Sequence, residues 1–415
     1  MKPLIISLLF IINIAPGQDV YLRLTDYGGG KINLIVQTFT AQGSASTLNE
    51  MERNNMVIEH VLKNDLEYSL YFEIIADTVN VGPDNTQGVV LNANAEGNNL
   101  TVQLEDFETR EKISERIYEI EKDLRKTAHT ISDDIVNILT GEQGIASTKI
   151  VFSYKTENGK EIGMVDYDGY NFTRITNNRN FNLFPAYAPD GGRILFSTYS
   201  DDRLSIYLYD FSEKQIEAVS SFQGLNFAPC WAPDGSKICM SLSKDGNAEL
   251  YLLDLQTKKM HRLTNNSAID TSPSFSPNSR EIAFVSDRSG NPQVYVMDTH
   301  GGNVRRLTFH GNYNTSPSWS PRGDIITYVS REKDNSQQVY VTDPTDFSPV
   351  RLTYLGNNEE PAWSPDGLHI VFSSNRTGSY ELYTMNWDGS RLRKLTRGII
   401  ANAPDWSPPG GKPNQ

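Results

Sequence analysis

Polar side chains recur just before a repeated proline, and together they suggest a surface that binds by hydrogen bonding. Asparagine, serine and threonine both donate and accept hydrogen bonds, whereas glutamate accepts them. These residue types suit recognition of a loop or helix inserted by another protein, although a plain solvated rim is the alternative. The candidate partner-binding residues are Phe184, Leu225, Asn226, Ala228, Asp270, Thr271, Ser272, Asn314, Thr315, Glu359, Glu360 and Asn402.

The two cysteines could react with each other. Cys230 and Cys239 flank a turn centred on Asp234-Gly235. A two-residue hairpin loop at this turn would make them directly opposite partners on adjacent strands. A disulfide can sometimes bridge such a separation in an oxidising, exported compartment. A pair of free thiols is the alternative.

The sequence contains none of the common catalytic motifs. It has no Gly-x-Ser-x-Gly elbow, no His-Glu-x-x-His pair, no phosphate-binding loop and no Cys-x-x-Cys pair. The six histidines, at positions 60, 129, 261, 300, 310 and 369, lack the spacing of metal ligands. His129 lies in a helical stretch, where a structural role is expected. We therefore expect a protein with no enzymatic activity, no cofactor and no metal.

A repeat of about 44 residues positions the candidate surface. The units begin at six prolines, at intervals of 44, 44, 44, 44 and 43 residues: Pro185, Pro229, Pro273, Pro317, Pro361 and Pro404. After the proline come an apolar run, an aliphatic-Tyr pair, an acidic turn and, in most copies, a basic residue with Leu-Thr. Four short strands in about 40 to 45 residues are typical of a propeller blade. Residues 145–410 are therefore expected to form a six-bladed β-propeller in a mainly β protein.

The two ends of the propeller are expected to close the ring together. The first repeat lacks its proline strand before Ile150, while a surplus copy, Pro404-Asp-Trp406-Ser, stands near the C-terminus. Pairing of that last strand with the first repeat would leave no open sheet edge. Removal of residues 402–415 should then open the ring.

One aromatic residue occupies the same place in every repeat. Such a residue can pack between adjacent sheets or, alternatively, offer a stacking platform to sugars or bases. Six matching copies favour packing, because every repeat needs a core whereas a binding site rarely needs six copies. The series is Tyr187, Trp231, Phe275, Trp319, Trp363 and Trp406.

The region before the repeats is expected to be a separate α/β domain covering residues 18–144. Strands are predicted at 20–24, 32–39 and 100–104, and an amphipathic helix at 48–66. A second helix is predicted at 124–139, with Gly141 as its C-terminal stop. Residues 113–124 fit either a helical stripe or a strand. Residues 411–415 are expected to be a short tail.

Composition and the N-terminus indicate an exported protein that does not bind nucleic acid. The net charge of -13 and the pI near 5.0 oppose phosphate binding. Residues 1–17 have the pattern of a secretory signal: Lys2, an apolar run, then Ala15-Pro16-Gly17. No later stretch is apolar enough to cross a membrane. We expect the mature protein to be exported, soluble and monomeric.

The junction between the two predicted domains resembles that of the TolB family of the Tol-Pal envelope system. The resemblance is carried by residues 128–133, 138–141, 149–152 and 166–171: Ala-His-Thr-Ile-Ser-Asp, Ile-Leu-Thr-Gly, Lys-Ile-Val-Phe and Asp-Tyr-Asp-Gly-Tyr-Asn. It extends over essentially the whole mature chain. It implies an N-terminal α/β domain followed by a six-bladed propeller, acting as a non-enzymatic adaptor in outer-membrane integrity, protein transport and cell division.

The resemblance also implies two protein partners. A peptidoglycan-associated lipoprotein (Pal) would bind at the propeller mouth, notably at Leu225, Ala228, Thr271 and Ser272. A TolA-like inner-membrane protein would bind the mature N-terminal strand, which comprises Gln18, Asp19, Val20, Tyr21, Leu22, Arg23, Leu24 and Thr25.

Two features depart from the family pattern. Leu225 stands where family members often have histidine, and residues 73–99 match poorly and look shortened. The alternative function is an exported propeller, related to those of peptidases, that binds glycan or peptide.

Overall fold

The computed structural model describes residues 30–75 and 88–410. The chain divides into two compact units between Gln143 and Gly144, and each is considered by itself. The predicted export signal (1–17), the predicted strand at 20–24 and the predicted tail (411–415) lie outside the described residues. No described helix is both long enough and apolar enough to span a membrane.

The first unit has a mixed sheet in the order β3-β1-β4-β5-β6, and β2 also pairs with β4. Strand β1 runs parallel to its neighbours β3 and β4, whereas β5 runs antiparallel to β4 and to β6. The segment that was ambiguous in the sequence forms β6 and pairs with β5, so the strand reading is confirmed. The strands are β1 (Ile32–Val36), β2 (Thr40–Gln42), β3 (Phe72–Ile75), β4 (Val89–Glu96), β5 (Asn99–Asp106) and β6 (Lys112–Glu119).

Both predicted helices are present, as α1 (Ala45–Tyr68) and α2 (Leu124–Thr140). The Asp123 side chain accepts hydrogen bonds from the first backbone N–H groups of α2. Gly141 ends that helix in the left-handed conformation, as predicted. The Nδ1 atom of His129 lies 2.7 Å from Oδ2 of Asp65, so this buried pair ties α2 to α1. His129 thus has a structural role.

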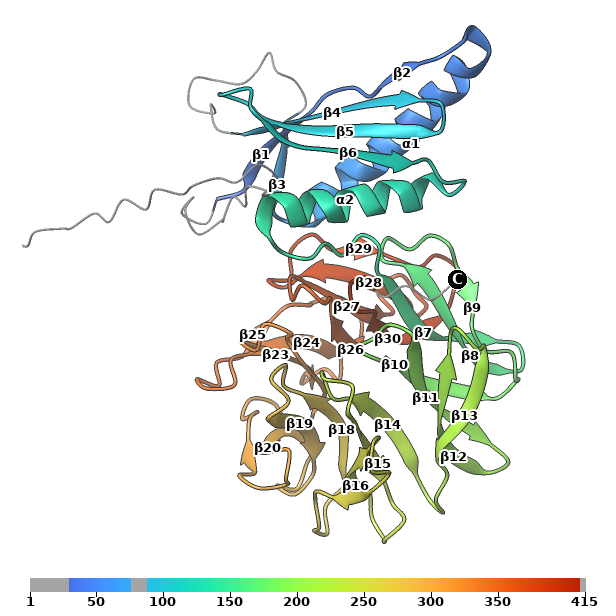
Figure 1. Ribbon diagram of the computed structural model, residues 1–415. Coiled ribbons are helices and arrows are strands. Elements are labelled where there is room, and N and C mark those ends of the chain that lie inside the picture. Colours follow the sequence, from blue (N-terminus) through green and yellow to red (C-terminus); the bar gives the residue numbers. More distant parts are fainter. Residues whose placement is uncertain (1–29, 76–87, 411–415) are drawn as a thin grey trace, which may run out of the picture. The chain divides into compact units, whose positions relative to one another are not determined.

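The second unit is a β-propeller (Figure 1). Among its described residues there are four sheets of four strands and one of eight strands. The eight-stranded sheet joins two antiparallel sets, β30-β7-β8-β9 and β10-β11-β12-β13, through one parallel pair between Phe181 and Lys160. The inner strands are β10 (Phe181–Tyr187), β14 (Asn226–Trp231), β18 (Asp270–Phe275), β22 (Asn314–Trp319), β26 (Asn358–Trp363) and β30 (Ala401–Trp406).

The remaining strands follow outward in the same order in each set. The second strands are β7 (Lys149–Thr156), β11 (Arg193–Ser200), β15 (Lys237–Leu242), β19 (Glu281–Ser286), β23 (Ile326–Arg331) and β27 (His369–Ser374). The third strands are β8 (Gly159–Asp166), β12 (Arg203–Asp210), β16 (Glu249–Asp254), β20 (Gln293–Asp298), β24 (Gln337–Thr342) and β28 (Glu381–Asn386). The outer strands are β9 (Thr173–Arg174), β13 (Gln215–Ser220), β17 (Met260–Arg262), β21 (Arg305–Arg306), β25 (Val350–Arg351) and β29 (Arg393–Lys394).

The two ends of this unit pair with each other. In Figure 1 the red strand β30 lies beside the green strand β7, and the register places Trp406 opposite Ile150. The Trp406 indole N–H donates to Oγ1 of Thr148 at 2.7 Å, and the Ser407 backbone N–H donates to the Lys149 carbonyl at 2.8 Å. The predicted pairing of the last strand with the first repeat is confirmed.

The repeated aromatic residues lie at the ends of the inner strands and are all buried, at most 8% exposed. Trp231, for example, belongs to a core cluster with Ala188 and Leu195, which come from the neighbouring sheet. Its indole N–H donates to the Ala186 carbonyl of the adjacent inner strand at 3.2 Å. Packing between sheets, rather than stacking on a ligand, is therefore the role of this series.

Candidate functional site

The candidate binding residues lie where the inner strands begin, at the end of the ring that we call the mouth. Each inner strand contacts the next, in the cycle β10-β14-β18-β22-β26-β30-β10. All of these residues except Leu225, which directly precedes β14, lie on the inner strands themselves. The strands bring them together, since the Ala403 backbone N–H on β30 donates to Oε2 of Glu360 on β26 at 2.5 Å.

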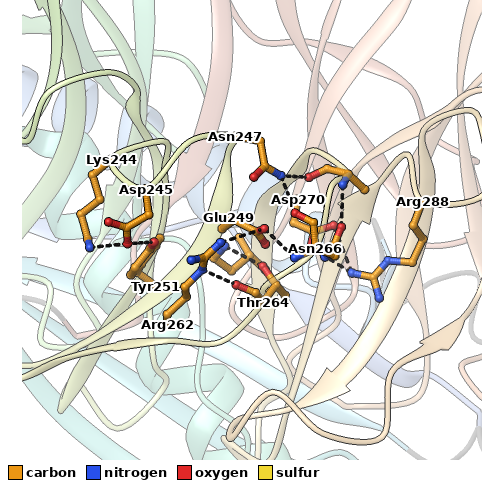
Figure 2. Close-up of polar contacts among 12 residues, drawn as sticks. Lys244, Asp245, Asn247, Glu249, Tyr251, Arg262, Thr264, Asn266, Asp270 and Arg288 are labelled. Carbon is orange, nitrogen blue, oxygen red and sulfur yellow. Dashed lines mark hydrogen bonds and ion pairs between the residues drawn. The ribbon is translucent and has the colours of Figure 1, made fainter.

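The first residue of most inner strands is buried and does not face the mouth. Asn226, Asp270 and Asn314 are all 0% exposed. Asp270 accepts a hydrogen bond from Nη2 of Arg288 at 2.9 Å, as Figure 2 shows. The side-chain amide of Asn314 donates to Oε1 of Gln293 at 2.8 Å. These three predicted site residues therefore hold the strand ends in place.

The second and third residues supply the side chains of the mouth. Positions are counted here from the buried residue at the start of each inner strand, which is Asn182 in β10. Thr271, Thr315, Glu359 and Asn402 are then second residues, and Phe184, Ala228, Ser272 and Glu360 are third residues; all eight are half-buried. The pairing of each inner strand with its second strand shifts register around the repeated proline, for example between Thr271 and Ser274 in β18. Such a shift is typical of a β-bulge.

Each bulge places its third residue in the left-handed region, although none of these residues is glycine. Their φ values lie between 48° and 54°: Phe184, Ala228, Ser272, Ser316, Glu360 and Ala403. A positive φ is uncommon for residues with a side chain, and strained backbone of this kind often accompanies binding sites. The same left-handed conformation thus recurs at six equivalent positions of the ring.

An apolar rim surrounds these residues, and sequence reasoning found only Leu225 of it. Each inner strand has a buried residue at its start, such as Asn226 in β14. The rim is formed by the residues that directly precede these buried residues, such as Leu225. Leu225 and Ile269 are 47% and 52% exposed, and the Tyr313 ring lies under the Arg331 guanidinium at 3.7 Å. A signal was present, because five of the six equivalent residues are apolar or aromatic: Phe181, Leu225, Ile269, Tyr313 and Ile400, with Asn357 as the sixth.

Aromatic and acidic side chains lie on different strands of the mouth. The Phe184 and Phe227 rings meet edge to face, with centroids 5.1 Å apart. Glu359 accepts a hydrogen bond from the Tyr380 hydroxyl at 2.5 Å. Burial raises the pKa of the Glu360 carboxyl, against the effect of the Ala403 N–H that it accepts. The mouth can thus contact apolar groups near β10 and β14 and hydrogen-bond donors near β26.

Asp405, two residues beyond the third position of β30, makes the stability of the ring depend on pH. Its Oδ2 atom accepts the Tyr187 backbone N–H at 2.6 Å, joining β30 to β10. Burial nevertheless raises the pKa of this carboxyl from 3.8 to about 6. Between about pH 4 and pH 6 the unfolded chain loses this proton before the folded protein does, so rising pH lowers stability by about 3 kcal/mol.

We expect Asp405→Asn to remove this pH dependence while keeping an acceptor for the Tyr187 N–H. Relative to the unsubstituted protein, the variant should gain about 3 kcal/mol in the free energy of unfolding between about pH 4 and pH 7. Denaturant titrations at both pH values measure this. Asp298→Asn should show almost no such change in this range, because backbone N–H groups of Gly302 and His300 lower the pKa of Asp298 and its effect on stability therefore falls below about pH 4. A difference that is independent of pH would contradict the assignment to Asp405.

Cys230 and Cys239 are direct partners in the register of β14 and β15, as the turn predicted. Both are free in the structure, so the disulfide stays a prediction. Burial raises the pKa of the Cys230 thiol, which slows any reaction that needs the thiolate.

Comparison with known proteins agrees with this architecture. Residues 136–409 match the family described as "TolB beta propeller domain". A "Tol-Pal system protein TolB" of Geobacter sulfurreducens is 34% identical over 206 residues, covering 44% of this chain and 47% of the relative. Another from Geobacter metallireducens is 42% identical over 101 residues, 24% of each chain. The chain thus matches about half or less of the length of these curated relatives.

Solved structures extend the likeness to both units. The crystal structure of TolB from Acinetobacter baumannii has a TM-score of 0.77 and 26% identity, covering 91% of this chain and 97% of that one. A chain of a nidogen/laminin complex, at 10% identity and a TM-score of 0.53, shares the fold alone over 63% of this chain and 98% of its own length. The family match covers well over half of the sequence, and the chain therefore belongs to the TolB beta propeller domain family.

Proposed function

We propose that this protein is a periplasmic, non-enzymatic adaptor of the Tol-Pal system with a six-bladed propeller. Its family membership and the names of its relatives support the system. The cycle of six contacting inner strands within residues 144–410 supports the blade number. Export rests on residues 1–17, which lie outside the described residues. Roles in outer-membrane integrity, protein transport and cell division rest on the family resemblance.

We infer that a Pal-like lipoprotein binds at the mouth. The observation that carries this proposal is the arrangement of half-buried polar side chains inside an exposed apolar rim. Thr271 represents the interior, where its Oγ1 lies 3.1 Å from the Ser241 hydroxyl, and Leu225 and Ile269 represent the rim. Protein interfaces commonly combine anchoring apolar contacts with hydrogen bonds. A TolA-like protein would bind Gln18–Thr25, which also lie outside the described residues.

The test is calorimetric titration with the periplasmic domain of the Pal-like lipoprotein from the same genome. We expect the unsubstituted protein to bind saturably, and Thr271→Arg to weaken binding by at least about 100-fold. The reason is steric, because a long charged side chain replaces a small, half-buried hydroxyl at the centre of the mouth.

Ile216→Arg is the matched control, since Ile216 is exposed on the outer strand β13, away from the inner strands. Its affinity should stay within about twofold of the unsubstituted protein. Equal weakening in both variants would remove the mouth as the binding site. Absence of binding by the folded, unsubstituted protein would reject Pal as the partner and favour a glycan or peptide ligand.

A further inference from the structure

Two repeats differ from the others at their outer edge, and the differences concern the basic residue of the Leu-Thr motif. In four outer segments Nε of the arginine donates to the carbonyl oxygen of the motif threonine, at 2.6–2.9 Å: Arg174, Arg262, Arg306 and Arg351. This hydrogen bond fixes each guanidinium at the edge of its sheet. The two Nη atoms of the guanidinium have different contacts in different sheets.

In three sheets a buried glutamate on the third strand neutralises the basic residue. Nη2 of Arg262 lies 3.1 Å from Oε1 of Glu249, a contact that Figure 2 shows. Arg174 makes the same contact with Glu161 at 3.1 Å. Lys394, which replaces the arginine in the last repeat, pairs with Glu381. The charge of the edge is cancelled within the sheet in each case.

The other two sheets have glutamine in place of that glutamate. Gln293 and Gln338 accept hydrogen bonds from the hydroxyl groups of Thr308 and Thr353, both at 2.8 Å. Unlike glutamate, these two glutamine side chains carry no charge. Among the described residues, no carboxylate lies within ion-pair distance of Arg306. Arg351 has only Glu332, at 3.8 Å, and that carboxylate also accepts the Tyr340 hydroxyl. The guanidinium of Arg306 is therefore uncompensated, and that of Arg351 is only weakly compensated.

The same two sheets also carry an aromatic residue directly after the motif threonine. Phe309 and Tyr354 are 65% and 72% exposed. Their rings lie 5.1 and 4.7 Å from the guanidinium carbons of Arg306 and Arg351. In the three sheets with glutamate this position is Asn177, Asn265 or Arg397. Glutamine in place of the buried glutamate and an aromatic residue after the motif threonine thus occur together in two neighbouring repeats and in no other repeat of the sequence.

Further apolar side chains enlarge the exposed surface at this edge. The Phe347 ring meets Phe309 edge to face, with centroids 5.8 Å apart. Leu355, next to Tyr354, is 65% exposed. Arginine and aromatic residues are the types that dominate binding energy at protein interfaces, and exposed apolar clusters mark such interfaces.

We propose that the outer edges of the β18–β21 and β22–β25 sheets form a docking surface for an acidic segment of a partner protein. Carboxylates of that segment pair with Arg306 and Arg351, and its apolar side chains contact Phe309 and Tyr354. Charge complementarity favours an acidic partner, because on a protein of net charge -13 the Arg306 guanidinium has no internal carboxylate among the described residues and that of Arg351 has only Glu332, at 3.8 Å. The surface uses none of the mouth residues, so it is independent of the function proposed above.

The test uses fluorescence anisotropy with a short labelled peptide in which glutamate and phenylalanine alternate with serine spacers. We expect saturable binding to the mature protein. The double variant Phe309→Asn/Tyr354→Asn introduces the residue found at Asn265 and should weaken binding at least about tenfold. Arg306→Gln should weaken it less and reduce its dependence on salt. These side chains are exposed or at the edge, so the melting temperature should confirm that the variants fold.

Ile216→Asn, an exposed position on another sheet, should leave binding within about twofold, as should Thr271→Arg at the mouth. A peptide with lysine in place of glutamate should not bind. The proposal is overturned by equal binding of the lysine peptide, by no effect of the double variant, or by no saturable binding at all. Self-association of the unsubstituted protein that Tyr354→Asn abolishes would assign the surface to a second copy instead.

Discussion

Replacing Trp406 with alanine is expected to lower the free energy of unfolding of the propeller by about 3–5 kcal/mol. Trp406 is 5% exposed and lies on the strand that closes the ring. Its substitution removes a large buried side chain and also leaves Oγ1 of Thr148 without the 2.7 Å hydrogen bond from the indole. Both losses fall where the two ends of the propeller pair with each other. Denaturant unfolding followed by tryptophan fluorescence and circular dichroism measures the change.

Trp387→Ala is the matched control, because Trp387 is 47% exposed. It should change stability by less than about 1 kcal/mol. Truncation after Gly398, which removes β30 entirely, should abolish cooperative unfolding, since β7 would become an open edge. A Trp406→Ala protein as stable as Trp387→Ala would show that closure by β30 contributes little to the fold.

Arg262→Ala is expected to destabilise the protein by about 3 kcal/mol, whereas Arg306→Ala should cost only about 1 kcal/mol. The two arginines make the same hydrogen bond to a motif threonine, at 2.9 and 2.6 Å. Only Arg262 neutralises a fully buried carboxylate, that of Glu249. Among the described residues, removal of Arg262 leaves that carboxylate with one hydrogen bond, from the Asn266 backbone N–H at 2.8 Å. Chemical denaturation of the two variants gives the comparison directly.

A double variant separates the charge from the side-chain volume. Glu249→Gln combined with Arg262→Ala should recover most of the loss, because no buried charge then remains. The chain itself shows that glutamine fits this environment, at Gln293 and Gln338. If Arg262→Ala and Arg306→Ala were equally destabilising, the difference between the two kinds of repeat would have no energetic meaning.

The repeat architecture was predictable because its signals are local and recur. The interval of 44 residues located the apolar run after the repeated proline, and such runs form the second strands, as in β15 (Lys237–Leu242). In the first unit α1 and α2 were predicted from their apolar stripes. Strands β2, β3 and β4 were missed. Strand β3 joins the sheet through parallel pairing with β1, which is not local in sequence, whereas β4 forms a local hairpin with β5 that sequence reasoning overlooked.

The mouth was harder to predict because a bulge breaks the alternation of buried and exposed side chains. Counting back by twos from buried Trp319 predicts that Pro317 and Thr315 are buried and that Asn314 is exposed. In the structure Asn314 is buried and Thr315 is half-buried. The bulge adds one residue to the strand, so the alternation of buried and exposed side chains is inverted on the N-terminal side of the bulge. The sequence thus assigned Asn314, the first residue of this stretch, to the wrong face of its strand.

The left-handed third residue of each inner strand has a consequence for how such a protein can diverge. A side chain in this conformation costs about 1–2 kcal/mol relative to glycine, yet the six positions hold phenylalanine, alanine, serine, glutamate and no glycine. The backbone shape therefore does not depend on which side chain is present. Ligand preference can drift one position at a time while the scaffold stays unchanged, so these six sites are natural positions for a combinatorial library that retargets the ring.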